Sequence, residues 1–396
     1  MENKIIYFDH AATTAVKPEV LEEMMPYFSV KYGNPSSIYS LGRDTRKAIE
    51  NSRVKVAKAI CAMPEEIFFT GSGTESDNWA IKGVAFANKD NKRHIITTNI
   101  EHHAVLHTCQ FLEHDGFEVT YLPVDKDGLI SIEKLSAAIK DNTVLVSVMT
   151  ANNEIGTIQP IAEIGKLCRE RGIYFHTDAV QAIGNIPIDV NAMNIDLLSM
   201  SAHKFYGPKG VGVLYIRKGV KIASFMHGGS QENKRRASTE NVAGIVGMGK
   251  AIELATSNVE QYNSKLIALR DRTINEIMNT IPYTRLNGHS HKRLPGNVNF
   301  SFEFIEGESM LLMLDSKGIQ ASSGSACTSG SLDPSHVLLA IGLPHEIAHG
   351  SLRLSFGEEN NDSDIDMLVD TLPKIVAKLR EMSPLYEEIE RGIKNV

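Results

Sequence analysis

Short apolar runs and longer helical patterns alternate along residues 43–218. The helical patterns cover residues 43–61, 75–88, 104–114, 131–140 and 160–171. The β-rich runs that separate and follow them cover residues 67–69, 94–98, 117–121, 143–148, 173–175, 195–198 and 211–216. This alternation predicts an α/β fold with a mostly parallel sheet that helices cover on both faces. No helical pattern separates the last two runs, so we expect one antiparallel strand.

The pattern changes beyond residue 241. Two long helical patterns run to about residue 280, and further β-rich runs and helices follow at 298–302, 307–317, 352–356 and from about 361. This order predicts a smaller α+β unit. We expect a large domain of residues 15–257 and a small domain of residues 1–14 plus 258–396.

Composition and charge narrow the class of protein. The chain has 396 residues, of which 42% are hydrophobic and 22% charged, so it can form a large core. Its 41 basic and 48 acidic residues give a net charge of −7, which argues against direct nucleic-acid binding. The N-terminus lacks a long apolar stretch, and no apolar run approaches the roughly 18 residues of a membrane span. We therefore expect a cytoplasmic protein without a membrane segment.

Two polar stretches follow buried strands and suggest the chemistry. Residues 176–181 contain Asp178, and residues 199–210 contain Lys204 between an apolar run and a Gly-Pro turn. Ligands of open α/β sheets bind at the carboxyl ends of the strands. A lysine amine there can form a Schiff base with pyridoxal phosphate, and an aspartate can keep the ring nitrogen protonated. A lone lysine is usually a surface charge, so this prediction depends on its context.

The two most specific stretches point to one known family. The segment around Lys204, with sequence SAHKFYGPKG, resembles the cofactor-lysine segment of cysteine desulfurases of the NifS/IscS type. The small polar residues of SSGSACTS around Cys327 are similar to that family's active-site loop, and they predict an accessible, mobile thiol suited to nucleophilic attack. The resemblance runs from Asp9 almost to the C-terminus. It implies an aspartate-aminotransferase-like fold, which is pyridoxal phosphate fold type I.

The resemblance also assigns residues to the cofactor. The turn GSGTES at residues 71–76 opens a helix whose N–H groups can hold a phosphate, although alone it would be an ordinary capping turn. By resemblance, His102 stacks on the cofactor ring and assists proton transfer. The other cofactor contacts that the resemblance implies come from Gly73, Thr74, Asn153, Asp178, Gln181, Ser201, His203, Lys204 and Thr239.

Thr239 is expected to act across a dimer. In the resembled family the equivalent threonine reaches the phosphate of the neighbouring subunit's cofactor, which implies a homodimer. That family usually has glycine directly before this threonine, whereas this chain has Ser238. The Thr239 contact is therefore the least conventional of the set.

The substrate contacts are predicted at two further positions. Arg353 lies inside an apolar strand, where an unpaired charge would be costly, so it forms either an internal salt bridge or a ligand contact. Its guanidinium suits a carboxylate, and the resemblance assigns it to the α-carboxylate of L-cysteine. Asn34, in the loop at residues 32–37, is the expected contact in the substrate cleft.

The implied reaction is removal of sulfur from L-cysteine. Lys204 or His102 would move protons, and the Cys327 thiolate would attack the substrate sulfur and keep it as a persulfide while L-alanine leaves. The persulfide would pass to an iron–sulfur scaffold protein of the IscU/NifU kind or to another acceptor such as a tRNA-thiolation system. Cys327 could also transiently ligate an iron–sulfur cluster on that partner.

Two other functions are compatible with parts of the sequence. An ordinary aminotransferase or a selenocysteine lyase would keep Lys204 and Asp178 without depending on Cys327. The residues 345–349 read HEIAH and satisfy a zinc-peptidase pattern, but a helix between Pro344 and the next β-rich run would be too short, so we expect no metal site. The remaining cysteines, Cys61, Cys109 and Cys168, are predicted to be small buried hydrophobes.

Overall fold

A seven-stranded sheet forms the centre of the computed structural model, which describes residues 5–323 and 334–390. The strand order is β2-β8-β7-β6-β5-β3-β4. The strands are β2 (Ile67–Thr70), β3 (His94–Thr98), β4 (Glu118–Leu122), β5 (Thr143–Ser147), β6 (Tyr174–Asp178), β7 (Leu197–Ser201) and β8 (Gly212–Ile216). Strand β8 is antiparallel to both of its neighbours, β2 and β7, and the other pairings in this sheet are parallel. The predicted mostly parallel sheet with one antiparallel strand is therefore present.

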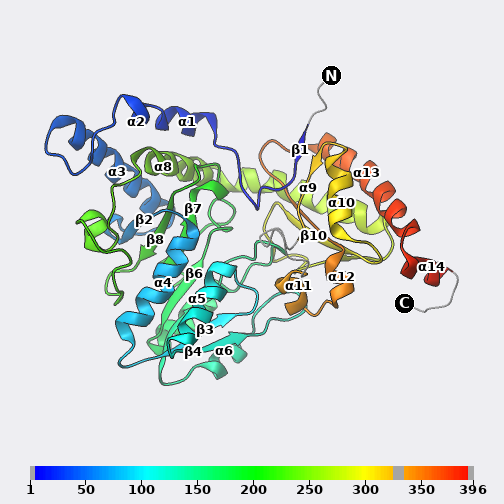
Figure 1. Ribbon diagram of the computed structural model, residues 1–396, viewed down its shortest axis with the longest axis horizontal. Coiled ribbons are helices and arrows are strands. Elements are labelled where there is room, and N and C mark those ends of the chain that lie inside the picture. Colours follow the sequence, from blue (N-terminus) through cyan, green and yellow to red (C-terminus); the bar gives the residue numbers. More distant parts are fainter. Residues whose placement is uncertain (1–4, 324–333, 391–396) are drawn as a thin grey trace.

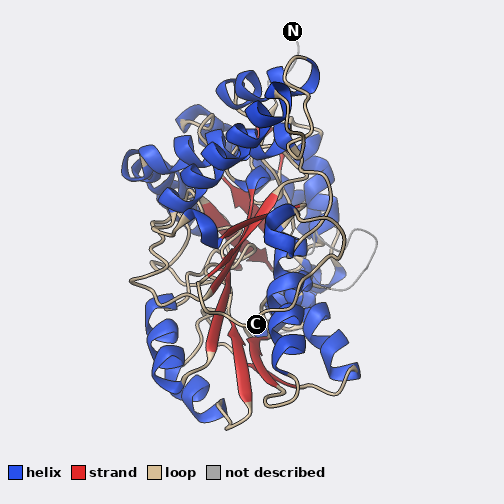
Figure 2. Ribbon diagram, turned by 90° about the vertical axis from the view of Figure 1, so that its left-hand side faces the viewer, coloured by secondary structure: helices blue, strands red, loops and turns tan. Residues whose placement is uncertain are grey.

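Helices cover both faces of this sheet (Figure 2). The helices of this part are α1 (Pro18–Met24), α2 (Pro26–Ser29), α3 (Ser40–Ala59), α4 (Gly73–Asn88), α5 (His103–His114), α6 (Ile132–Ala138), α7 (Ile161–Arg171) and α8 (Val242–Ser257). Successive strand residues point to opposite faces. Ile96 and Val146 pack in the core that α3, α7 and α8 cover, whereas Ile95 and Leu145 pack with Trp79 of α4.

A second, smaller part follows in the chain and has its own core. Its antiparallel sheet has the order β12-β10-β9, and β1 pairs with β11 in parallel. The strands are β1 (Ile6–Tyr7), β9 (Thr284–Leu286), β10 (Asn297–Phe302), β11 (Ile319–Gln320) and β12 (Ser351–Ser355). The helices are α9 (Val259–Thr280), α10 (Gly307–Asp315), α11 (His336–Ala340), α12 (His345–His349), α13 (Asp362–Glu381) and α14 (Pro384–Glu390). This is the α+β unit that the sequence predicts.

Residues 8–17, which we call the strap, join the two parts. The strap runs from β1, beside the smaller sheet, to α1, beside the larger one (Figure 1). At its beginning the Ser355 N–H donates to the Phe8 carbonyl oxygen over 2.7 Å. Further along, the Thr14 N–H donates to the His203 carbonyl oxygen over 2.9 Å. The strap is therefore hydrogen-bonded to both parts of the molecule.

Strands β6 and β7 extend beyond the apolar runs from which they were predicted. Their polar residues lie within the sheet because they bond across strands. His176 Nδ1 lies 2.8 Å from Ser147 Oγ of β5, and His176 Nε2 lies 3.0 Å from Ser199 Oγ of β7. Buried polar groups that are paired in this way do not end a strand. Asp178 is consequently the last residue of β6 instead of a loop residue.

The cysteine predictions hold for two of three positions. Cys109 and Cys168 are buried, whereas Cys61 is exposed, so the prediction for Cys61 was wrong. Cys61 lies just after the end of α3 with a left-handed backbone, at a φ of 58°. The chain leaves the helix there, and the buried face of α3 ends before Cys61.

The HEIAH segment forms the five-residue helix α12. Within residues 5–323 and 334–390, no group of three His, Cys, Asp or Glu side chains is arranged to hold a metal ion. In the same residues, no helix combines the length and apolar character needed to cross a membrane.

Candidate active site

A pocket of about 260 Å³ lies at the carboxyl ends of β6 and β7. Its lining also includes the strap residues Ala11 and Ala12 and Arg353 of β12, so both parts of the molecule contribute to it. The predicted site residues that line this pocket are Gly73, Thr74, His102, Asn153, Asp178, Gln181, Ser201, His203, Lys204 and Arg353.

Two predicted site residues lie away from this pocket, and a third is not among the described residues. Asn34 and Thr239 are exposed and do not line the pocket. Cys327 lies outside the described residues. Ser238, directly before Thr239, has a φ of 107°, a backbone region that favours glycine. This explains physically why a glycine would suit that position.

Lys204 ends a short 3₁₀ helix, Ala202–Lys204, that follows β7 directly. Its Nζ donates to the Ala11 carbonyl oxygen over 2.6 Å and to the Ala12 carbonyl oxygen over 2.8 Å. Gln181 Nε2 donates to the same Ala11 oxygen over 2.9 Å. The strap therefore presents carbonyl oxygens to the amine, and it leaves the amine facing the pocket that Asp178 also lines.

Asp178 is buried, and its Oδ1 accepts the Val180 N–H over 2.9 Å. Burial raises the pKa of Asp178 to about 6, although the Val180 N–H and the charge of Lys204 oppose this rise. Burial and the charge of Asp178 also raise the pKa of Asp77, which lines the pocket from α4. Asp77 Oδ1 is buried and has no hydrogen-bond partner among the described residues. The floor of the pocket can therefore bind a cation.

Two histidines of the pocket are neutral. His102 caps α5, and its Nδ1 accepts the Ala104 N–H over 3.1 Å, so the neutral ring carries its proton on Nε2. Burial and the charge of Lys204 lower the pKa of His102 to about 4. The same two causes lower the pKa of His203 to about 4. A neutral His102 can stack on a flat ring and exchange a proton at Nε2.

The N-terminus of α4 faces the pocket with glycine at its first position. Ser72 caps the helix by accepting the Glu75 N–H over 3.1 Å. The first N–H groups of a helix have no partner within it, so those of Gly73 and Thr74 can bind an anion. A Cβ atom on Gly73 would lie 2.7 Å from Val180 Cγ2, and therefore only glycine fits without displacement.

Arg353 lies in β12 and is 2% exposed. Its Nη2 donates to Asp9 Oδ1 over 2.8 Å, and its Nη1 donates to the Asn153 carbonyl oxygen over 3.2 Å. Its Nε is buried and has no partner in the part of the chain that the structure describes. The internal ion pair considered from the sequence is thus present, and donor capacity remains for a carboxylate in the pocket.

Several contributors to the pocket were not predicted. Ala11 and Ala12 act through main-chain carbonyl oxygens, which leave no side-chain signal in a sequence. No partner was predicted for Asp9, and its ion pair with Arg353 depends on the pairing of the strap with β12. Asp77 could have been found, because it lies one helical turn after Gly73 on the same face of α4.

Comparisons with known proteins agree with this geometry. Residues 6–368 match the family model described as aminotransferase class-V. The cysteine desulfurase IscS of Clostridium botulinum strain Hall is 64% identical over 388 residues, which are 98% of each chain. A solved NifS-like protein has a TM-score of 0.89 and 40% identity, covering 95% of this chain and 100% of its own. SspA, solved in complex with cysteine, has a TM-score of 0.80 and 41% identity, covering 89% and 98%.

These matches confirm the resemblance to NifS/IscS-type cysteine desulfurases and the predicted fold class. The family match spans most of the chain, including β1, the strap, both sheets and the first turns of α13. The chain belongs to the class-V aminotransferase family.

Proposed function

We propose that this protein is a pyridoxal-phosphate-dependent cysteine desulfurase that converts L-cysteine to L-alanine and keeps the sulfur on Cys327. The observation that carries the proposal is the convergence of Lys204, Asp178 and Arg353 on one pocket. Relatives that share 64% identity over 98% of the chain are named cysteine desulfurases, which supports the same reaction.

The residues of the pocket fit pyridoxal phosphate. Lys204 would bind it covalently through its amine, Asp178 would pair with the ring nitrogen, and His102 would stack on the ring. Asn153 and Gln181 would bond the ring hydroxyl, and the phosphate would bind at Gly73, Thr74, Ser201 and His203. When bound, the cofactor withdraws electrons from the substrate and so weakens its C–S bond.

The chain's own groups would perform the remaining steps. Arg353 would hold the substrate carboxylate, with Asn34 as a second contact, and Lys204 or His102 Nε2 would move protons. The Cys327 thiolate would attack the substrate sulfur, an S–S bond would form, and the C–S bond would break with its electron pair left on carbon. Protonation of that carbon gives L-alanine, so one thiol and L-cysteine become one persulfide and L-alanine.

The proposed partners are a second copy of this chain and a protein that accepts the sulfur. A homodimer would let the exposed Thr239 reach the phosphate of the neighbouring site. The persulfide would pass to an iron–sulfur scaffold protein or to another sulfur acceptor in the cytoplasm. We also retain the division into a large domain of residues 15–257 and a small domain of residues 1–14 plus 258–396.

Incubation of the purified protein with L-cysteine tests this function. We expect L-alanine in solution and one additional sulfur on the peptide that contains Cys327. The variant Cys327→Ser should release no alanine beyond background and carry no added sulfur on that peptide. Persulfide formed at the normal rate by Cys327→Ala would overturn the proposal, whereas bound cofactor with neither product would favour an aminotransferase or a lyase.

A further inference from the structure

The position of the Lys204 amine depends on the strap. Its Nζ donates to two main-chain carbonyl oxygens, those of Ala11 and Ala12. A main-chain carbonyl cannot turn independently of the chain that carries it. Whatever fixes the strap next to Ala11 therefore also fixes the place where the amine is held.

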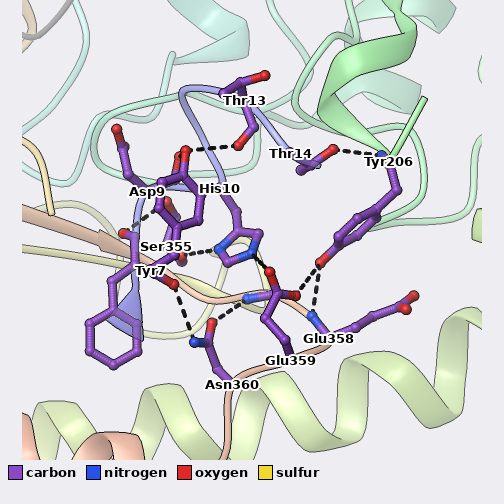
Figure 3. Close-up of polar contacts among 12 residues, drawn as sticks. Tyr7, Asp9, His10, Thr13, Thr14, Tyr206, Ser355, Glu358, Glu359 and Asn360 are labelled. Atoms are coloured by element: carbon purple, nitrogen blue, oxygen red, sulfur yellow. Dashed lines mark hydrogen bonds and ion pairs between the residues drawn. The ribbon is translucent and has the colours of Figure 1, made fainter. Parts of the chain in front are cut away.

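One carboxylate joins the two segments that flank this contact (Figure 3). Glu359 Oε1 lies 2.8 Å from His10 Nε2, and His10 directly precedes Ala11 on the strap. Glu359 Oε2 accepts the Tyr206 hydroxyl over 3.3 Å, and Tyr206 lies two residues after Lys204. Glu359 thus bonds to the strap on one side of the amine and to the lysine's own turn on the other.

The hydrogen bonds of His10 fix its protons. Its Nδ1 lies 2.9 Å from the Ser355 carbonyl oxygen, which can only accept, so Nδ1 carries a proton. Its Nε2 faces the Glu359 carboxylate, which also needs a donor. Both bonds are made when the ring is an imidazolium, and the contact with Glu359 is then a charge-assisted hydrogen bond.

The electrostatics of Glu359 agree with an ion pair. Burial alone would raise the pKa of Glu359, but the hydrogen bond and charge of His10 outweigh it and lower the pKa to about 2. The space around the pair is also restricted, because a Cβ atom on Gly357 would overlap His10 Nε2. The Tyr7 ring meets the His10 ring edge-on, at 4.9 Å between centroids.

The lysine's turn is held from the same side. Tyr206 has a left-handed φ of 62°, its N–H donates to Thr14 Oγ1 over 2.7 Å, and its hydroxyl accepts the Glu358 N–H over 2.8 Å. The turn is therefore bonded both to the strap and to the segment that carries Glu359.

We propose that Glu359, through His10 and Tyr206, is a positioning residue for Lys204 that holds the strap carbonyls and the lysine's turn in register. The proposal rests on the proposed function only for what the amine does. The hydrogen bonds between the Lys204 amine and the strap are made by the chain alone, so their effect on the amine can be measured without the cofactor.

The test is the rate at which Lys204 is chemically labelled in the cofactor-free protein. Reductive methylation with formaldehyde and cyanoborohydride is followed by mass spectrometry of the Lys204 peptide, with exposed Lys374 as the internal reference. Glu359→Ala should raise the labelling rate of Lys204 severalfold relative to Lys374, because the carbonyl oxygens no longer stay at the amine. Glu359→Gln should label nearly as the unmodified protein does, since its amide can still bond to both His10 and Tyr206.

Glu358→Ala is the matched control. Glu358 is the neighbouring residue, and its side chain pairs with Lys17 at the end of the strap that is far from Ala11 along the chain. Only its main-chain N–H bonds to Tyr206, and the change to alanine keeps that group. We expect no change in Lys204 labelling for this variant. If Glu359→Ala does not fold, Tyr206→Phe replaces it, because that change removes one hydroxyl and should give a smaller increase of the same sign.

The outcomes separate the two proposals. Equal Lys204 labelling in Glu359→Ala, or in its substitute, and in Glu358→Ala would overturn the positioning role, as would a rise that Lys374 shares. Borohydride reduction of the cofactor-loaded protein and peptide mapping test the lysine's function separately. If the reduced cofactor is attached elsewhere, the proposed function fails, while the labelling rates still decide the role of Glu359.

Discussion

At the scale of single residues, the pocket contains two buried carboxyl groups whose charges the surrounding residues compensate only in part. Asp178 and Asp77 are both buried, and burial raises the pKa of both carboxyls. The charge of Lys204 lowers the pKa of Asp178, but burial outweighs it. A protonated ring nitrogen at Asp178 would add the opposite charge that favours its ionised form. The electrostatics therefore suit the proposed cofactor better than a neutral ligand.

Arg353→Lys tests the substrate contact. A lysine ammonium cannot hold Asp9 and the Asn153 carbonyl while also binding a carboxylate side by side. The KM for L-cysteine should rise about 10- to 100-fold, because the substrate loses one or two charge-assisted hydrogen bonds. The cofactor content should stay constant. Steady-state alanine release measures this change.

Arg272→Lys provides the control for Arg353→Lys. Arg272 also pairs with carboxylates, those of Glu276, Asp362 and Asp366, but it lies outside the pocket. Its KM should equal that of the unmodified protein. An unchanged KM in Arg353→Lys would contradict the assignment.

Glu101 gives a prediction for the pH dependence of stability. Its Oε1 accepts the Thr98 hydroxyl over 2.7 Å and the Met149 N–H over 3.0 Å. Burial raises the pKa of Glu101 to about 8, whereas an unfolded glutamate has a pKa of about 4.3. The folded chain holds a proton that the unfolded chain releases between these values. The contribution to stability is therefore complete below pH about 4.3 and is lost as pH rises through about 8.

Glu101→Gln removes this dependence, because the amide does not titrate. The unmodified protein should lose stability relative to the variant as the pH rises from 5 to 8. The difference between their free energies of unfolding should change by at most about 1.4 kcal/mol for each pH unit. Urea unfolding at several pH values measures the difference. Parallel pH profiles for the two proteins would contradict the assignment of a neutral carboxyl.

At the scale of elements, the start of α4 links packing to binding. In Gly73→Ala the added Cβ would lie 2.7 Å from Val180 Cγ2 and 3.4 Å from Ser201 Cβ, so it pushes against Val180. Cofactor affinity should fall by about tenfold or more, which corresponds to about 1.4 kcal/mol. A titration of the cofactor-free protein followed by absorbance measures this affinity.

The control acts on the opposite end of the same helix. Asn88→Ala removes a side-chain bond to the Val84 carbonyl oxygen at the C-terminal end of α4, far along the helix from the pocket. It should change the unfolding temperature but not the affinity for the cofactor. Equal losses of affinity in both variants would indicate a general weakening of α4 instead of a local effect at Gly73.

The elements also show what a sequence can and cannot reveal. Helices such as α3 and α5 were predicted because several turns repeat one apolar face, and the central strands because they are short, apolar and regularly spaced. The two-residue strands β1 and β11 are too short to carry a period. The strap depends on their pairing, so its contacts with Lys204 could not be predicted. Most side chains of the pocket were predicted, but the carbonyl oxygens that hold its lysine were not.

At the scale of the whole molecule, the pocket depends on contacts between its two parts. Lys204 follows a strand of the seven-stranded sheet, whereas Arg353 lies in the three-stranded sheet. The strap and the Glu154–Ser335 hydrogen bond cross between the parts, and Ser335 also caps α11. A change in the relative position of the sheets would therefore move the proposed substrate contact away from the proposed cofactor lysine.

The proposed dimer can be tested by mixing two variants whose sites are impaired in different ways. If Thr239 serves the neighbouring site, a dimer of one Lys204→Ala subunit and one Thr239→Val subunit has one site with both defects and one intact site. Alanine release should then return after the two proteins are unfolded together and refolded. If Thr239 serves its own site, each site of the mixed dimer keeps one defect, and mixing restores nothing. Because the exposed Thr239 does not line the pocket of its own chain, we expect the first result.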